Sequence, residues 1–345
     1  MGCGMRVSLI LSFLATFLSS ASQSVYAFDK EKLFQAYFTI VMIHGYDEKG
    51  GLGSGSGVVV GPNKVLTNCH VFRTTSRPWI ARGEDTYAIN SVKADTWHDL
   101  CLVSTDPLPL KSATIGQTLN LKRRQEVVGF GHSNGVPAPL TSNGVVQGLY
   151  DDAPGKVIRT SAKFLMGASG SGLFDLDGNL IGINTFKTAG KWGSVHFALP
   201  IEWLDKLDKQ TENSTFPISG KALWEEDEDK KPFYMQAAVP ESRADWPKLV
   251  QVAEKWTAQE PKSSEAWFAL GLGQENNGKA DLAEQAYKKA IEMASDNFEA
   301  MLKLGALAKA RGDQAEMHRI QLVLNDADKD VATEFADTLG CDKAC

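Results

Sequence analysis

Ser169 is the residue of this chain whose surroundings best suit nucleophilic chemistry. It lies in the run GASGSG at 167–172, ahead of a strand-turn-strand pattern that begins at Leu173. The flanking glycines permit a tight bend, which can expose a hydroxyl while neighbouring backbone N–H groups converge on one point. Glycine-serine runs are also common in ordinary turns. The interpretation therefore depends on a base and an acid elsewhere in the chain.

A histidine and an aspartate stand where they could serve as that base and acid. His70 ends the run GSGVVVGPNKVLTNCH at 55–70, in which two β-branched stretches flank a Gly-Pro-Asn turn and predict a hairpin. Asp99 stands directly before the apolar run LCLV at 100–103. Each position alone is typical of a structural residue. The order His, Asp, Ser is nevertheless that of the chymotrypsin arrangement, so the coincidence favours a catalytic triad.

The segment from about residue 35 to 205 resembles the trypsin-like serine peptidases of the compact bacterial kind, close to the HtrA family. The resemblance rests on the block that ends at His70, on DLCLV at 99–103, and on GASGSGLFDLDGNLIGINT at 167–185. It implies a chymotrypsin-like fold, an all-β double β-barrel.

The resemblance also implies roles for individual residues. Ser169 would attack the scissile carbonyl, His70 would take and return the proton, and Asp99 would orient the imidazole. The backbone N–H groups of Gly167 and Ser169 would form the oxyanion hole.

Two features depart from the family pattern. Ala168 stands where digestive enzymes place an aspartate that pairs with a freshly cut N-terminus, which argues against activation by that salt bridge. Ser171 and Gly172 replace the usual Gly-Pro, and this change removes no catalytic group. Asp95 and His98 are rival candidates for acid and base, but neither has the strand context of the residues chosen above.

The resemblance places the pocket for the side chain before the scissile bond between two segments. One runs from Lys163 to Met166, and the other surrounds Val195 and His196. No aspartate stands at the pocket base, which argues against a preference for Lys or Arg. Val195 would narrow the slot and favour small or medium apolar residues; alternatively, Lys163 or His196 would select an acidic one. We expect the apolar preference, because desolvating a lysine in an apolar pocket is costly.

The N-terminus has the pattern of a secretory signal peptide. Arg6 precedes an apolar run from Val7 to Leu18, and small residues lead to a predicted cleavage after Ala27. A run of about 12 apolar residues is too short to cross a bilayer core of about 30 Å. We therefore expect an exported protein, periplasmic or secreted, with no stable membrane anchor after cleavage.

The charge and the cysteines bear on partners and cofactors. The formal net charge is -6 and the pI is near 5.6, which argues against nucleic acid as a partner. The triad implied by the resemblance would bring Cys69 next to Cys101, so we expect a disulfide there; two buried free thiols are the alternative. Cys341 and Cys345 are spaced too loosely for a zinc motif and suggest a small terminal disulfide loop. We expect no metal and no cofactor.

Beyond residue 245 the strand pattern gives way to a 34-residue self-similarity. The recurring positions are Trp267, Leu270 and Gly271, which return as Met301, Leu304 and Gly305. The second helix of the unit has Ala283, Tyr287 and Ala290 at small-aromatic-small positions. This pattern resembles tetratricopeptide repeats; a generic helical bundle is the alternative. Repeats of this kind commonly bind a peptide or a protein.

These observations predict four segments: a signal peptide at 1–27, a serine protease domain at 28–210, a charged linker at 211–244 and an all-α, tetratricopeptide-like domain at 245–345. The predicted function is that of a serine-type endopeptidase acting on protein or peptide substrates. A binding or adaptor protein with a catalytically silent protease fold is the alternative. Since every triad member precedes the linker, we expect a chain ending near residue 220 to cleave small peptides.

Overall fold

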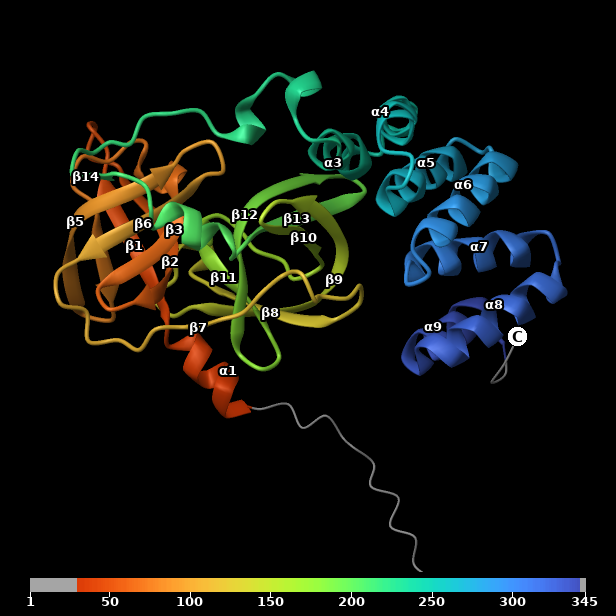
Figure 1. The fold of residues 1–345 in the computed structure, drawn as a ribbon, viewed down its shortest axis with the longest axis horizontal. Helices are drawn as coiled ribbons and strands as arrows, with labels where there is room; N and C mark the ends of the chain where they lie inside the picture. Colours follow the sequence, from red (N-terminus) through yellow and green to blue (C-terminus); the bar gives the residue numbers. More distant parts are fainter. Residues whose placement is uncertain (1–29, 342–345) are drawn as a thin grey trace, which may run out of the picture.

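The computed structural model describes residues 30–341, which form two β-barrels followed by an array of helices (Figure 1). The predicted signal peptide and Cys345 lie outside the described residues. Among residues 30–341, no helix has the length and apolar character needed to cross a membrane.

The first barrel is built from antiparallel strands and closes because β5 pairs with both β4 and β6. Two-residue β14 extends it by pairing with β5. The sheet order is β14 (Glu212–Asn213), β5 (Asp85–Asp95), β4 (Trp79–Arg82), β1 (Ile40–Tyr46), β2 (Leu52–Gly61), β3 (Lys64–Asn68) and β6 (Leu100–Thr105).

The second barrel closes in the same way, because β11 pairs with both β8 and β12. Two-residue β7 runs parallel to β12 at its edge. The order is β11 (Ser171–Asp175), β8 (Glu126–Gly131), β9 (Leu140–Asp152), β10 (Gly155–Thr160), β13 (Gly193–Pro200), β12 (Asn179–Gly190) and β7 (Thr114–Ile115). The expectation of a double β-barrel is thus confirmed.

The predicted all-α region is confirmed, and its helices recur at the predicted interval. Helices α5 and α7 begin at Ser264 and Phe298, and α6 and α8 begin at Ala280 and Gln314, so that each pair is 34 residues apart. The described helices are α1 (Lys30–Tyr37), α2 (Trp203–Leu207), α3 (Phe233–Arg243), α4 (Trp246–Gln259), α5 (Ser264–Asn276), α6 (Ala280–Met293), α7 (Phe298–Ala310), α8 (Gln314–Ala327) and α9 (Lys329–Leu339). Their tetratricopeptide character stays a prediction.

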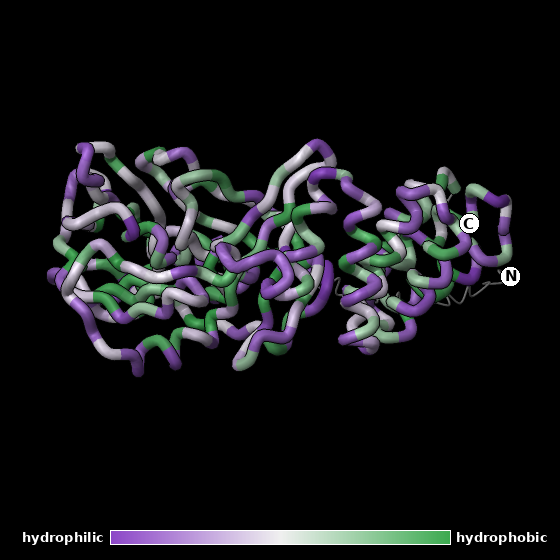
Figure 2. Tube along the Cα trace, turned by 90° about the horizontal axis from the view of Figure 1, so that it is seen from above, coloured by the Kyte–Doolittle hydropathy of each residue, from purple (hydrophilic) through white to green (hydrophobic). Residues whose placement is uncertain are grey.

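Packing within the array explains the recurring glycine. A Cβ on Gly271 would lie 2.5 Å from the Tyr287 ring, and one on Gly305 would lie 2.1 Å from the Phe335 ring. Only a glycine lets the ring of a later helix approach the backbone so closely. Figure 2 shows hydrophobic and hydrophilic residues alternating along these helices, the pattern of helices that bury one face.

The helices pack against the second barrel. One apolar cluster runs from α1 through the second barrel into α3, α4 and α5. Arg159 of β10 forms a two-pronged ion pair with Glu241 of α3, at 2.9 and 2.5 Å. Arg123 and Arg124, which precede β8, make ion pairs with the helices farther along the array.

The segment 211–244 is more structured than the predicted charged linker. It contains β14, a 3-10 turn at Leu223–Glu225 and the helix α3. Ala222 and Leu223 are buried, because the segment crosses loops of the first barrel before it reaches α3. The charged residues Asp227–Lys230 and the stretch 211–215 are exposed, which is the solvated character expected of a linker.

Candidate active site

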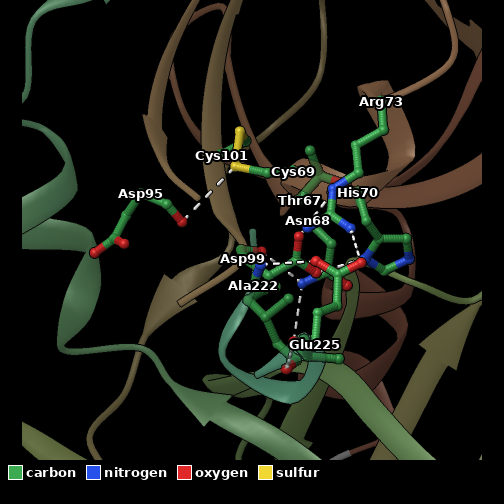
Figure 3. A network of polar contacts seen from close by, with 12 residues as sticks. Thr67, Asn68, Cys69, His70, Arg73, Asp95, Asp99, Cys101, Ala222 and Glu225 are labelled. Carbon is green, nitrogen blue, oxygen red and sulfur yellow. Dashed lines mark hydrogen bonds and ion pairs between the residues drawn. A yellow bond between two sulfur atoms is a disulfide. The ribbon is translucent and has the colours of Figure 1, made fainter. Parts of the chain in front are cut away.

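His70 is held where the hairpin of β2 and β3 ends. The apolar residues of β3 are buried between β2 and β6, and the chain then enters a 3-10 turn, Cys69–Phe72, that carries the histidine. The backbone N–H of His70 donates to Asp99 Oδ1 at 2.7 Å, and Nδ1 lies 2.5 Å from Asp99 Oδ2. The imidazole keeps 30% of its surface exposed. The exposed part of the ring can therefore contact a substrate while Nδ1 is held by Asp99 (Figure 3).

Asp99 is fully buried at the start of β6. Its φ of 57° lies in the left-handed region, which aspartate tolerates better than most residues. Its backbone carbonyl accepts hydrogen bonds from Asn68 Nδ2 at 2.9 Å and from Cys69 N at 3.2 Å. Burial raises the pKa of the Asp99 carboxyl, and the hydrogen bonds from His70 oppose that rise. Both oxygens of the Asp99 carboxylate thus interact with His70.

Ser169 lies in the loop between β10 and β11, against the strands that lead to His70. Its carbonyl oxygen accepts a hydrogen bond from Ser56 N at 2.8 Å. A Cβ on Gly170, which has a φ of +82°, would lie 2.2 Å from Thr67 Oγ1 and 2.9 Å from Asn68 N. This close approach ties the serine loop of the second barrel to the end of β3. Among the hydrogen bonds of residues 30–341, none joins the Ser169 hydroxyl to His70; such bonds are often long without substrate.

The backbone around Ser169 leaves two N–H groups available. Within residues 30–341, neither Gly167 N nor Ser169 N donates a hydrogen bond. The Met166 carbonyl accepts from Asn134 N at 2.5 Å. Because the carbonyl and N–H of a trans peptide point in opposite directions, the Gly167 N–H points away from Asn134. The Gly167 carbonyl is fixed in turn by the Ser56 hydroxyl at 2.8 Å.

The predicted pocket residues separate into two pairs. Lys163 and Met166 are exposed, Met166 with 78% of its surface. Val195 and His196 are buried, and the Phe164 ring meets the His196 ring at 4.9 Å. Burial, reinforced by the positive charges of Lys187 and Lys163, lowers the pKa of His196 to about 4. At neutral pH the His196 side chain is therefore uncharged.

The disulfide between Cys69 and Cys101 is present, as predicted, and joins the 3-10 turn that carries His70 to β6, which begins directly after Asp99. Because Cys345 lies outside the described residues, its bond to Cys341 stays a prediction. The rival residues Asp95 and His98 form their own pair, with Nδ1 and Oδ2 2.7 Å apart. The His98 ring stacks on Trp203 of α2 at 3.8 Å, which accounts for it as a packing residue.

Four residues near the site were missed by the sequence reasoning. Ser56 and Asn68 lie inside the motif at 55–70, and their hydrogen bonds to the serine loop and to Asp99 explain why a serine and an asparagine stand there. Trp224 and Glu225 approach His70 and Arg73 from the segment after the second barrel. Nothing in the sequence around these two residues signals that contact.

Among residues 30–341, no group of three or more histidine, cysteine or acidic side chains is arranged to hold a metal ion. The site combines an oriented imidazole, a serine hydroxyl and two backbone N–H groups that donate no hydrogen bond within the described part of the chain. These groups together are suited to acyl transfer.

Comparison with known proteins agrees with this geometry. Residues 55–183 match the family described as "Trypsin-like peptidase domain". A probable periplasmic serine endoprotease, DegP-like, of Halomonas elongata is 30% identical over 45% of this chain and 34% of its own length. The periplasmic pH-dependent serine endoprotease DegQ of Escherichia coli is 31% identical over 46% of this chain and 37% of its own.

The chain spans about a third of the length of the curated relatives it matches. Among solved structures, the Rv3671c protease of M. tuberculosis in its active form aligns with 55% of this chain and 88% of its own, at 21% identity and a TM-score of 0.47. The matched segment of this chain is thus similar to the peptidase domain of serine endoproteases.

Proposed function

We propose that this protein is an exported serine endopeptidase that cleaves peptide bonds with His70, Asp99 and Ser169. The observation that carries the proposal is the double hydrogen bond of the buried Asp99 carboxylate to His70, beside the serine loop. An ionised carboxylate can only accept hydrogen bonds, so Nδ1 carries a proton and Nε2 is the free base.

In this mechanism the Ser169 hydroxyl attacks the scissile carbonyl while His70 Nε2 takes its proton. The imidazolium then gives that proton to the departing amine, which leaves an acyl-enzyme. Water repeats the sequence, releases the acid and regenerates the serine. Asp99 stabilises the imidazolium in both halves and holds the tautomer.

The negative oxygen of each tetrahedral intermediate would lie between Gly167 N–H and Ser169 N–H. Loss of one such donor typically costs about 3 to 4 kcal/mol of transition-state stabilisation. The unused N–H groups and the orientation of the Met166 peptide support a hole that is already formed.

The helical array would bind a protein or peptide, and export would place the enzyme in the periplasm or outside the cell. Two relatives with periplasmic names support this location. Cell fractionation followed by N-terminal sequencing tests it, with Phe28 as the expected first residue of the mature chain.

A fluorophosphonate probe tests the catalytic proposal, because only an activated serine reacts with it rapidly. We expect the full chain to be labelled on Ser169 and Ser169→Ala to stay unlabelled. A full chain that is folded and unreactive would point to the silent binding protein instead.

A further inference from the structure

We propose that residues 216–225, here named the strap, are part of the active site, with Trp224 and Glu225 as positioning residues for His70. The strap follows β14 at the edge of the first barrel, runs across that barrel and leads towards α3 (Figure 1). The inference rests on the proposed function, because it gives these residues a role relative to a catalytic histidine.

The strap holds both chain segments that carry the acid and the base. Ile218 N donates to the carbonyl of Phe72, two residues after His70, at 3.1 Å. Leu223 N donates to the carbonyl of Trp97, two residues before Asp99, at 2.9 Å. One short segment therefore fixes the two loops relative to each other, in addition to the disulfide.

Trp224 contacts the imidazole directly. Its ring meets the His70 ring edge to face at 5.9 Å and stacks on Phe186 of β12 at 6.3 Å. An aromatic ring in this position limits rotation of the imidazole about its side-chain bonds. Because His70 stays 30% exposed, Trp224 flanks the histidine without closing the site.

Glu225 acts on the turn that carries His70. Its carboxylate forms an ion pair with Arg73, at the end of that turn, and accepts a hydrogen bond from Ala222 N at 2.8 Å (Figure 3). Although partial burial acts to raise it, hydrogen bonds from Ala222 and Arg73 hold the pKa of Glu225 below its usual range. Glu225 is therefore negatively charged at neutral pH, and it balances the positive charge of Arg73 close to His70.

The ion pair with Arg73 is made by Glu225, at the N-terminal end of the charged run. Asp227 and Glu228 pair with Lys230 and Lys231 inside the run, whereas Glu225 reaches across to the first barrel. Asp229 is exposed and lies only four residues from Glu225. It therefore provides a matched control for the loss of a carboxylate from the same segment.

The test uses the full chain with Trp224→Ala, Trp224→Phe, Glu225→Ala and the control Asp229→Ala. The readouts are the rate of fluorophosphonate labelling and kcat and KM for a small peptide ester. A third readout, independent of activity, is the low-field proton resonance of the His70 Nδ1 hydrogen bond to Asp99. Circular dichroism establishes that each variant is folded.

We expect Trp224→Ala and Glu225→Ala to lower the labelling rate and kcat by about 10- to 100-fold, as misplacement of a catalytic group does, with little change in KM. Trp224→Phe should recover most of the loss, and Asp229→Ala should match wild type. The low-field resonance should broaden or vanish in the two alanine variants of the strap alone.

Wild-type labelling rates in both strap variants would overturn the inference and leave the proposed function standing. If wild type itself resists the probe, the proposed function fails. The resonance then decides the inference: an unchanged signal in Trp224→Ala would overturn it, and its selective loss would support the positioning role.

Discussion

A disulfide joins Cys69, which adjoins His70, to Cys101, which lies two residues after Asp99. Cys69 directly precedes the histidine, and Cys101 follows the aspartate on β6. The covalent bond therefore maintains the spacing of His70 and Asp99 in addition to cross-linking the first barrel.

Removing this bond should lower the free energy of unfolding. For Cys69→Ala combined with Cys101→Ala we expect a loss of about 2 to 4 kcal/mol, because the cross-link restricts the unfolded chain. Denaturant unfolding of oxidised wild type, reduced wild type and the double variant measures it. Equal midpoints for all three would contradict the expectation.

Ser169→Ala should abolish peptide hydrolysis and leave the fold intact, since the change removes a hydroxyl and little volume. Losses of about 10⁴- to 10⁶-fold in turnover follow the removal of a triad serine. Turnover of a peptide substrate and thermal unfolding are measured side by side. Similar cleavage by the two purified proteins would disprove the triad assignment.

The pocket should select small or medium apolar residues before the cut. His196 is buried and uncharged at neutral pH, so it offers no cation to an acidic side chain, and Lys163 is exposed. A peptide-library profile is the measurement, with Lys163→Ala expected to give the same preference. A profile dominated by Glu or Asp that disappears in Lys163→Ala would reverse this assignment.

Breaking the Arg159 ion pair should lower stability far more than breaking a similar pair on the helices. Arg159→Gln leaves Glu241, with only 10% of its side chain exposed, without its partner, and breaking such a pair costs about 3 to 5 kcal/mol. The control is Arg319→Gln, because Arg319 pairs with Glu316 by two hydrogen bonds but is 58% exposed; its loss should cost below about 1 kcal/mol. Equal costs in denaturant unfolding would argue against α3 as a fixed part of the second barrel.

Stability should fall as the pH drops from 6.5 to 4. Burial lowers the pKa of His196 from its usual 6.5 to about 4 and also lowers that of His132. In this window the unfolded chain binds protons that the native state does not, so unfolding is favoured. His196 alone accounts for about 3 kcal/mol, at about 1.4 kcal/mol per pKa unit.

The variant His196→Gln should flatten this part of the pH dependence, whereas His318→Gln, at an exposed position of α8, should not. Urea unfolding at several pH values provides the comparison. A slope that is the same in His196→Gln and wild type would exclude His196 as its origin.

The sequence predicts the parts of the site that lie in continuous motifs. His70, Asp99 and Ser169 each stand at a strand end or in a glycine turn, so strand pattern and turn chemistry make them candidates, and the family resemblance implies their roles. Gly170 is a further case, because its neighbours Thr67 and Asn68 belong to the same motif as His70.

The strap could not be predicted in this way. Trp224 borders a run of charges that is typical of a solvated segment, and its contact with His70 depends on the path of the chain across both barrels. Helix α3 was missed for a local reason, because Pro240 lies inside it and proline usually ends a helix. A chain ending near residue 220 lacks Trp224, Glu225 and α3. Its expected cleavage of small peptides stays a prediction, and the role proposed for the strap predicts the opposite result.

The two adjacent arginines before β8 bear on how the helical array can bend. A repeat array is usually elastic, because each repeat contacts only its neighbours. Here Arg123 contacts Glu265 of α5 and Asp296 just before α7, and Arg124 contacts Glu299 of α7 and Glu334 of α9. Bending the array would break these four ion pairs. The helices should therefore move with the second barrel as one rigid unit. A pull applied at α9 would then be transmitted to the barrel that carries Ser169.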